Sequence, residues 1–197
     1  IWDRKWLTNN GYYHKELEKA LAAYLGVPYI SLFTNGTLPL ITALQALRIT
    51  GEVITTPYSF VATTHSLWWN GIKPVFVDVD EKTGNIDPDK IEAAITERTK
   101  AIIPVHYAGR CCDMDKINAI AKKHNLFVLE DAAHGLSTEY KGKRIGGQGN
   151  TAAFSFYVTK NISTAEGGML TTDDPEVYEK ASILSLHGMS KDAWARY

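Results

Sequence analysis

The sequence has 197 residues, of which 45% are apolar and 11% are aromatic. Disordered chains are poor in aromatic residues, so this composition excludes disorder and predicts a protein with a buried core. The 21 basic and 22 acidic residues give a formal charge of −1, which gives no reason to expect a nucleic acid as partner. No apolar run is long enough to span a bilayer, so we expect no membrane partner.

The sequence begins at Ile1 without an initiator Met and without the regions of a signal peptide. We therefore expect further residues ahead of it. The only cysteines are the neighbours Cys111 and Cys112. Adjacent cysteines rarely form a disulfide, and a zinc site needs spaced ligands, so we expect neither a disulfide nor a metal site. A cytoplasmic location fits these free thiols best.

Predicted strands and helices alternate along the chain. The strands are expected over 29–33, 52–56, 74–79, 101–105, 126–129, 152–156 and 169–172. The helices are expected over 14–26, 37–47, 61–70, 87–95, 113–124 and 175–186. This alternation predicts an α/β protein with a mostly parallel sheet covered by helices on both faces. Ligands bind at the carboxyl ends of the strands in such sheets, so the residues that follow each strand are the candidates for a site.

Asn35, Gly36 and Thr37 follow a predicted strand and open a helix. The first N–H groups of a helix and the positive end of its dipole suit a phosphate. Gly36 allows the backbone to approach closely, and Thr37 offers a hydroxyl group. An ordinary helix-capping turn explains this segment better when it is considered alone.

Asp131 ends an apolar strand, where its carboxylate could bind a metal or hold a protonated ring nitrogen. A helix cap is the alternative, since Ala132 and Ala133 could begin a helix. His134 could brace the carboxylate, although such a histidine is more often hydrogen-bonded packing.

Lys160 follows a segment that leaves the predicted core. Apolar surroundings disfavour the charged ammonium form, and a neutral amine is what a Schiff base requires. The alternative is a solvated loop lysine. Phe60 could stack on a flat ring, although most phenylalanines are core residues. Together, a phosphate turn, an aromatic side chain, a carboxylate and a lysine form the set that pyridoxal phosphate requires.

The chain resembles the DegT/DnrJ/EryC1/StrS family of pyridoxal-phosphate sugar aminotransferases over nearly its whole length. The matching segments are 34–37, 56–63, 74–79, 103–106, 130–134, 154–162 and 166–168. The resemblance implies the fold of type I pyridoxal-phosphate transferases, with a large domain built on a mixed, mostly parallel sheet. Residues 1–197 would be the N-terminal segment and most of that cofactor-binding domain.

The resemblance also implies roles for single residues. Lys160 would hold the cofactor as a Schiff base and then move a proton between substrate and cofactor carbons, and Asp131 would pair with the pyridinium nitrogen. The remaining cofactor-binding residues would be Asn35, Gly36, Thr37 and Ser155 at the phosphate, Phe60 stacked on the ring and His134 near the ring hydroxyl.

Family members that act as dehydratases carry a histidine at the position of Lys160, so the lysine favours transamination. The implied substrates are a nucleotide-linked keto sugar and glutamate as amino donor. Residues 186–194 resemble a branch of 4-aminotransferases, which suggests a 4-keto-6-deoxyhexose that feeds a surface polysaccharide.

Family members are about twice as long as this chain, so we expect a small C-terminal domain in the complete protein. The resemblance also implies a homodimer with shared active sites. The alternative hypothesis is a non-catalytic relative that binds or senses a sugar nucleotide. A dinucleotide-dependent oxidoreductase is disfavoured, because no Gly-x-Gly-x-x-Gly turn follows a strand.

Overall fold

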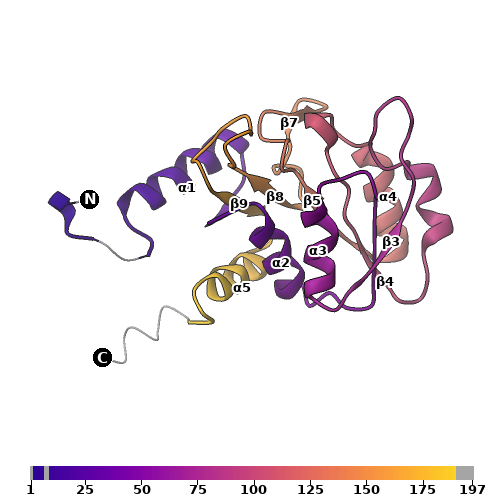
Figure 1. Ribbon diagram of the computed structural model, residues 1–197, viewed down its shortest axis with the longest axis horizontal. Coiled ribbons are helices and arrows are strands. Elements are labelled where there is room, and N and C mark those ends of the chain that lie inside the picture. Colours follow the sequence, from indigo (N-terminus) through magenta and orange to yellow (C-terminus); the bar gives the residue numbers. More distant parts are fainter. Residues whose placement is uncertain (1, 7–8, 190–197) are drawn as a thin grey trace.

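The computed structural model describes residues 2–6 and 9–189. Its centre is a seven-stranded sheet that crosses the molecule from one end to the other (Figure 1). The strands are β1 (Tyr29–Phe33), β2 (Glu52–Thr55), β3 (Lys73–Phe76), β4 (Thr99–Ile102), β5 (Phe127–Asp131), β8 (Thr151–Ser155) and β9 (Gly168–Thr172). Their order is β1-β9-β8-β5-β4-β2-β3, and only β9 is antiparallel to its neighbours.

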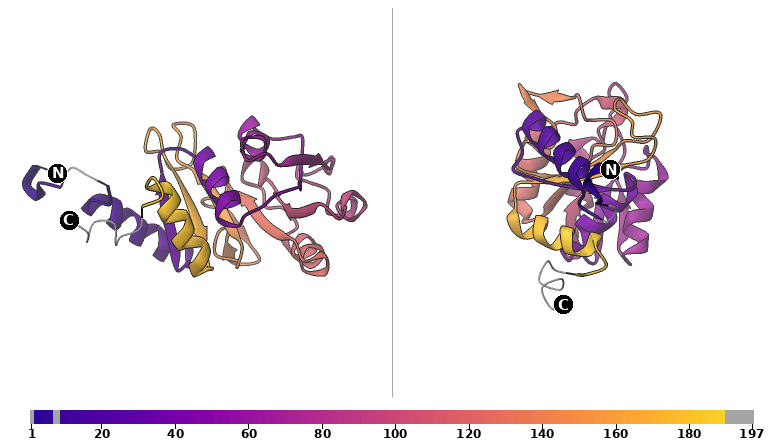
Figure 2. Two further views of the ribbon diagram at one scale, coloured as in Figure 1. Left: turned by 90° about the horizontal axis from the view of Figure 1, so that it is seen from below. Right: turned by 90° about the vertical axis from the view of Figure 1, so that its left-hand side faces the viewer.

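Helices cover both faces of this sheet. They are α1 (Tyr12–Leu25), α2 (Thr37–Ala46), α3 (Val61–Trp69), α4 (Met114–His124) and α5 (Pro175–Ser185). Helices α2, α3 and α5 share one apolar cluster with the sheet, whereas α1 and α4 belong to two clusters on the opposite face. Helices α1 and α5 lie at the same end of the molecule, beside β1 and β9 (Figures 1 and 2). The predicted α/β architecture is confirmed.

Apolar residues on the central strands alternate between the two faces. Val53 packs under α2 and α3, whereas the next residue, Ile54, packs beneath α4. Ala153 and Phe154 divide in the same way between the two faces. Because successive side chains of a strand point in opposite directions, strands that are apolar at consecutive positions must be covered on both sides.

Acidic residues cap two of the helices. The carboxylate of Asp174 accepts hydrogen bonds from Glu176 and Val177, and Asp113 accepts one from Lys116. Each cap satisfies backbone N–H groups that have no partner within the helix. Among the described residues, no helix is both long and apolar enough to cross a membrane.

The helix predicted over 87–95 is wrong. Two short 3-10 turns, Pro88–Lys90 and Glu92–Ala94, stand there instead. Asp87 caps the first turn as expected, but the buried Ile91 anchors the segment and Ile95 already has extended backbone angles. The extended conformation of Ile95 ends the second turn, so the segment does not continue as an α-helix.

A two-residue hairpin was not predicted. Strand β6 (Glu139–Tyr140) pairs with β7 (Lys143–Arg144), and the turn residues Lys141 and Gly142 both have positive φ angles. Positive φ at both turn positions is typical of a tight hairpin turn. Cys111 and Cys112 are both free thiols, as the sequence predicts.

Candidate functional site

A cavity of about 390 Å³ lies at the carboxyl ends of the parallel strands. Segments that follow β1, β2, β4, β5 and β8 contribute to its wall. All the site residues predicted from the sequence line it, namely Asn35, Gly36, Thr37, Phe60, Asp131, His134, Ser155 and Lys160. Segments more than 100 residues apart therefore meet where the sheet topology places a ligand.

Strand β8 ends at Ser155, and Lys160 lies in the loop that follows it. Its side chain is half-buried, and its Nζ atom lies 2.7 Å from Nε2 of His134. Burial lowers the pKa of the Lys160 ammonium, and the negative charge of Asp131 partly opposes this. Burial and the Lys160 charge also lower the pKa of His134. The amine thus has an environment that favours its neutral, nucleophilic form.

Asp131 is the last residue of β5 and is only 6% exposed. One carboxylate oxygen accepts a hydrogen bond from the Thr63 hydroxyl at 2.7 Å, and the other accepts the backbone N–H of Ala133 at 3.2 Å. Its backbone N–H donates to the carbonyl of Pro104, and its carbonyl accepts the N–H of His106, both in the segment that follows β4. The carboxylate is therefore held in a fixed position beneath the cavity.

The turn before α2 is a capped helix start. Oδ1 of Asn35 accepts the N–H groups of Thr37 and Leu38, each at 3.0 Å. The capping role that the sequence favours is thus present. The N–H of Gly36 and the hydroxyl of Thr37, for which the described residues supply no hydrogen-bond acceptor, are the donors left for an anion.

Gly36 packs directly against Ser155. A Cβ atom at Gly36 would lie 2.6 Å from Cβ of Ser155 and 3.1 Å from its Cα. The Ser155 hydroxyl oxygen accepts the N–H of Tyr157 at 3.3 Å, so its proton is free to point into the cavity. Because Gly36 has no side chain, the turn before α2 can pack directly against the end of β8.

Phe60 lies in the wall of the cavity, directly before α3, and is 76% exposed. A phenylalanine with so much exposed ring contributes little to the core. It presents an apolar face to whatever enters the cavity.

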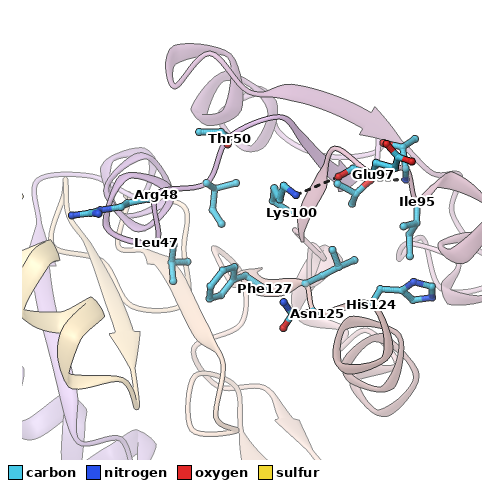
Figure 3. A pocket seen from close by; sticks show the side chains of 13 residues that line it. Leu47, Arg48, Thr50, Ile95, Glu97, Lys100, His124, Asn125 and Phe127 are labelled. Carbon is cyan, nitrogen blue, oxygen red and sulfur yellow. Dashed lines mark hydrogen bonds between the residues drawn. The ribbon is translucent and has the colours of Figure 1, made fainter.

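A larger hollow of about 670 Å³ lies at the amino ends of β2, β4 and β5, on the side of the sheet opposite to the carboxyl ends of these strands (Figure 3). Its wall holds Arg48, Lys100 and Phe127, but these groups do not converge. The guanidinium of Arg48 points away from the hollow, and the Lys100 amine donates to the carbonyl oxygen of Glu97 at 3.3 Å. Size alone does not make this hollow a site, so the smaller cavity with the lysine and the carboxylate is the stronger candidate.

Thr63 and Tyr107 belong to the site but were not singled out from the sequence. Thr63 bonds Asp131 directly, and Tyr107 lines the cavity with its hydroxyl 2.9 Å from that of Tyr58. Thr63 lies in a segment that matches the family, but the contact spans 68 positions. No local pattern shows such a contact.

The sequence matches the model of the DegT/DnrJ/EryC1/StrS aminotransferase family over residues 1–197. The chain belongs to this family. One similar protein is the dTDP-4-amino-4,6-dideoxy-D-glucose transaminase of Shigella dysenteriae, which is 54% identical to this chain over 188 residues. The alignment covers 95% of this chain and 51% of that protein, so the chain spans about half the length of such relatives.

Solved structures show the same fold. DesI, crystallised in the presence of its TDP-sugar product, has a TM-score of 0.93 at 38% identity, over 98% of this chain and 49% of that one. NtdA from Bacillus subtilis with bound cofactor PMP has a TM-score of 0.85 at 37% identity, over 91% and 41% of the two chains. The residues 190–194, which carry part of the resemblance to 4-aminotransferases, lie outside the described residues.

Proposed function

We propose that the complete protein is a pyridoxal-phosphate-dependent aminotransferase that acts on a nucleotide-linked keto sugar. The observation that carries this proposal is one cavity that holds a half-buried lysine amine, a buried carboxylate and an exposed phenylalanine ring. Membership of an aminotransferase family supports it.

The residues in the cavity fit the cofactor. The Lys160 amine, whose pKa burial lowers, would hold the aldehyde group, and Asp131 would accept a hydrogen bond from the ring nitrogen. Phe60 would cover one face of the ring. When bound, the cofactor supplies an electron sink that allows an amino group to be transferred.

The phosphate group would lie at the start of α2. Gly36 contributes a backbone N–H, and the hydroxyls of Thr37 and Ser155 contribute two further donors from the neighbouring segments. Asn35 supports this site indirectly, because its amide oxygen holds the first turn of the helix. His134, 2.7 Å from the Lys160 amine, would lie next to the reacting end of the cofactor.

The side chains in the cavity suggest which residue transfers the proton during the reaction. Lys160 is a basic amine in the cavity, and in our proposal it carries a proton to and from the carbon atom that bears the amino group. Asp131 is held by Thr63 and Ala133, which keeps its charge beneath the ring. The buried position of Asp131 limits access of water to its carboxylate.

The substrates are inferred from the relatives. The names of the Shigella transaminase and of the DesI structure support a sugar linked to a nucleoside diphosphate. We propose a 4-keto-6-deoxyhexose as the acceptor and glutamate as the amino donor. We also propose a cytoplasmic homodimer in which the second subunit and a small C-terminal domain complete the cavity.

A non-catalytic sugar-nucleotide sensor of the same fold is the alternative. Such a protein would not need a lysine amine in the cavity with a carboxylate close enough to affect its pKa. The presence of Lys160 at this place therefore favours the enzyme.

A turnover assay with the complete protein tests the proposal. Purified protein is mixed with pyridoxal phosphate, glutamate and dTDP-4-keto-6-deoxyglucose, and the amino sugar is measured by mass spectrometry. We expect product with the natural protein and none with Lys160→Ala. Cofactor binding without turnover of any keto-sugar nucleotide would support the sensor instead.

A further inference from the structure

Thr63 is a fully buried residue whose hydroxyl lies behind Asp131, a residue of the cavity wall. It lies in α3, is 0% exposed and does not line the cavity itself. Three oxygen atoms surround its Oγ1: Oδ2 of Asp131 at 2.7 Å, Oγ of Ser59 at 2.6 Å and the carbonyl oxygen of Phe60 at 3.1 Å. A threonine hydroxyl has only one proton, so the three contacts cannot all be donations from Thr63.

The charges and distances decide where that proton goes. The carboxylate of Asp131 is acceptor-only and negatively charged, and hydrogen bonds to such acceptors are shorter and stronger than bonds to a neutral carbonyl. The contact to Asp131 is also 0.4 Å shorter than the one to Phe60, from 2.7 against 3.1 Å. Thr63 therefore donates to Asp131. The hydroxyl of Ser59 then has to donate to Thr63.

We propose that Thr63 is a positioning residue whose hydroxyl, polarised by Ser59, fixes the orientation of the Asp131 carboxylate toward the cofactor. The two donors on Asp131, Thr63 and the N–H of Ala133, bond different oxygen atoms. The side chain of the strand-end residue is thereby prevented from rotating. This inference rests on the proposed function, because it assigns Asp131 to the ring nitrogen.

The alternative is a purely local role. Buried threonines in helices often donate to a carbonyl three or four residues earlier, and the carbonyl of Phe60 is in that position. In that case the hydroxyl would matter to α3 and not to the cofactor. Thr64, the next residue, makes this local bond to Val61 and provides a matched control.

The test measures the affinity of the complete protein for pyridoxal phosphate by absorbance titration. Thr63→Val keeps the shape and removes the hydroxyl, Thr63→Ser keeps the hydroxyl, and Thr64→Val removes the neighbouring hydroxyl. We expect Thr63→Val to weaken cofactor binding on the order of tenfold, as loss of a hydrogen bond to a charged group implies. The affinity of Thr63→Ser for pyridoxal phosphate should stay within about threefold of that of the natural protein. The affinity of Thr64→Val should equal that of the natural protein.

Equal affinities of Thr63→Val and Thr63→Ser would overturn the proposal. If Thr63→Val does not fold, the comparison of Thr63→Ala with Thr63→Ser replaces it, because these two also differ in the hydroxyl. If both hydroxyl-free variants fail to fold while Thr63→Ser folds, the hydroxyl serves the fold and the proposal is wrong. Cofactor binding is measured without substrate, so a protein that binds the cofactor but lacks transaminase activity would refute the proposed function and leave this test intact.

Discussion

The amine of Lys160 is subject to two opposing influences. Burial lowers its pKa from the ordinary value of 10.5, and the charge of Asp131 raises it. Both can be measured without any cofactor, because they are properties of the folded chain. The sequence predicted the lysine and the carboxylate as parts of one cofactor site, and the fold places both in one cavity.

Replacing Asp131 by Asn should therefore lower the pKa of Lys160 further. In the ligand-free complete protein, the rate of labelling by acetic anhydride is followed against pH and quantified at Lys160 by mass spectrometry. The natural protein should show a midpoint below 10.5, and Asp131→Asn a still lower one. Lys116, whose pKa is raised by Asp89, is the control and should not differ between the two proteins. An unchanged or higher midpoint for Lys160 would show that the two groups are not coupled.

At the scale of elements, the start of α2 and the end of β8 must approach each other closely. The contact between Gly36 and Ser155 leaves no room for a side chain. The sequence predicted both elements and their neighbouring turns, since each is set by local periodicity and capping. It did not predict the closeness of the contact, which depends on the order of the strands in the sheet.

Gly36→Ala should destabilise the protein by about 1–3 kcal/mol, the usual cost of overpacking, and should weaken cofactor binding. Urea denaturation measures the first effect. Combining the change with Ser155→Gly removes the atom nearest to the new methyl group, so the double variant should recover part of the loss. A stable Gly36→Ala variant would mean that the two elements can separate freely.

The start of β2 is held by a buried carboxylate. Glu52 has only 3% of its side chain exposed and accepts hydrogen bonds from Thr96 at 2.6 Å and Lys73 at 3.2 Å. The bond from Thr96, then the one from Lys73, lowers the pKa of Glu52 below its ordinary value of 4.5. The folded state thus holds the charged form, and its stabilisation is present above the unfolded pKa and lost as the pH falls through the folded one.

Glu52→Gln should lower the melting temperature by several degrees at neutral pH. Because protonated glutamate resembles glutamine, the difference between the two proteins should shrink as the pH falls below 4.5. Thermal unfolding followed by circular dichroism at a series of pH values measures this. A difference that stays constant down to strongly acidic pH would contradict the assigned role of the Glu52 charge.

At the scale of the whole molecule, the site depends on parallel strands that end at one edge. Alternation of strands and helices was sufficient to predict this arrangement and to direct the search to Asp131 and Lys160. Thr63 could not be found in that way, because its contact with Asp131 joins α3 to β5 across 68 positions. The segment 87–95 was assigned wrongly for a related reason, since the buried Ile91 overrides the local helical pattern.

The chain spans about half the length of relatives such as the Shigella transaminase. The cavity is lined by Lys160, Asp131 and Phe60, and by the turn residues Gly36 and Thr37, which we propose as phosphate donors. We expect the remaining half of the protein and a second subunit to add contacts to the sugar substrate and to the phosphate. We propose that residues of this chain hold the cofactor.

Chemical trapping of the cofactor shows directly whether Lys160 is the residue that holds it. The complete protein is incubated with pyridoxal phosphate, reduced with borohydride and digested, and the modified peptide is sequenced by mass spectrometry. We expect a single phosphopyridoxyl group on Lys160, and no such group in Lys160→Ala. A label on another lysine, or none on Lys160, would contradict it.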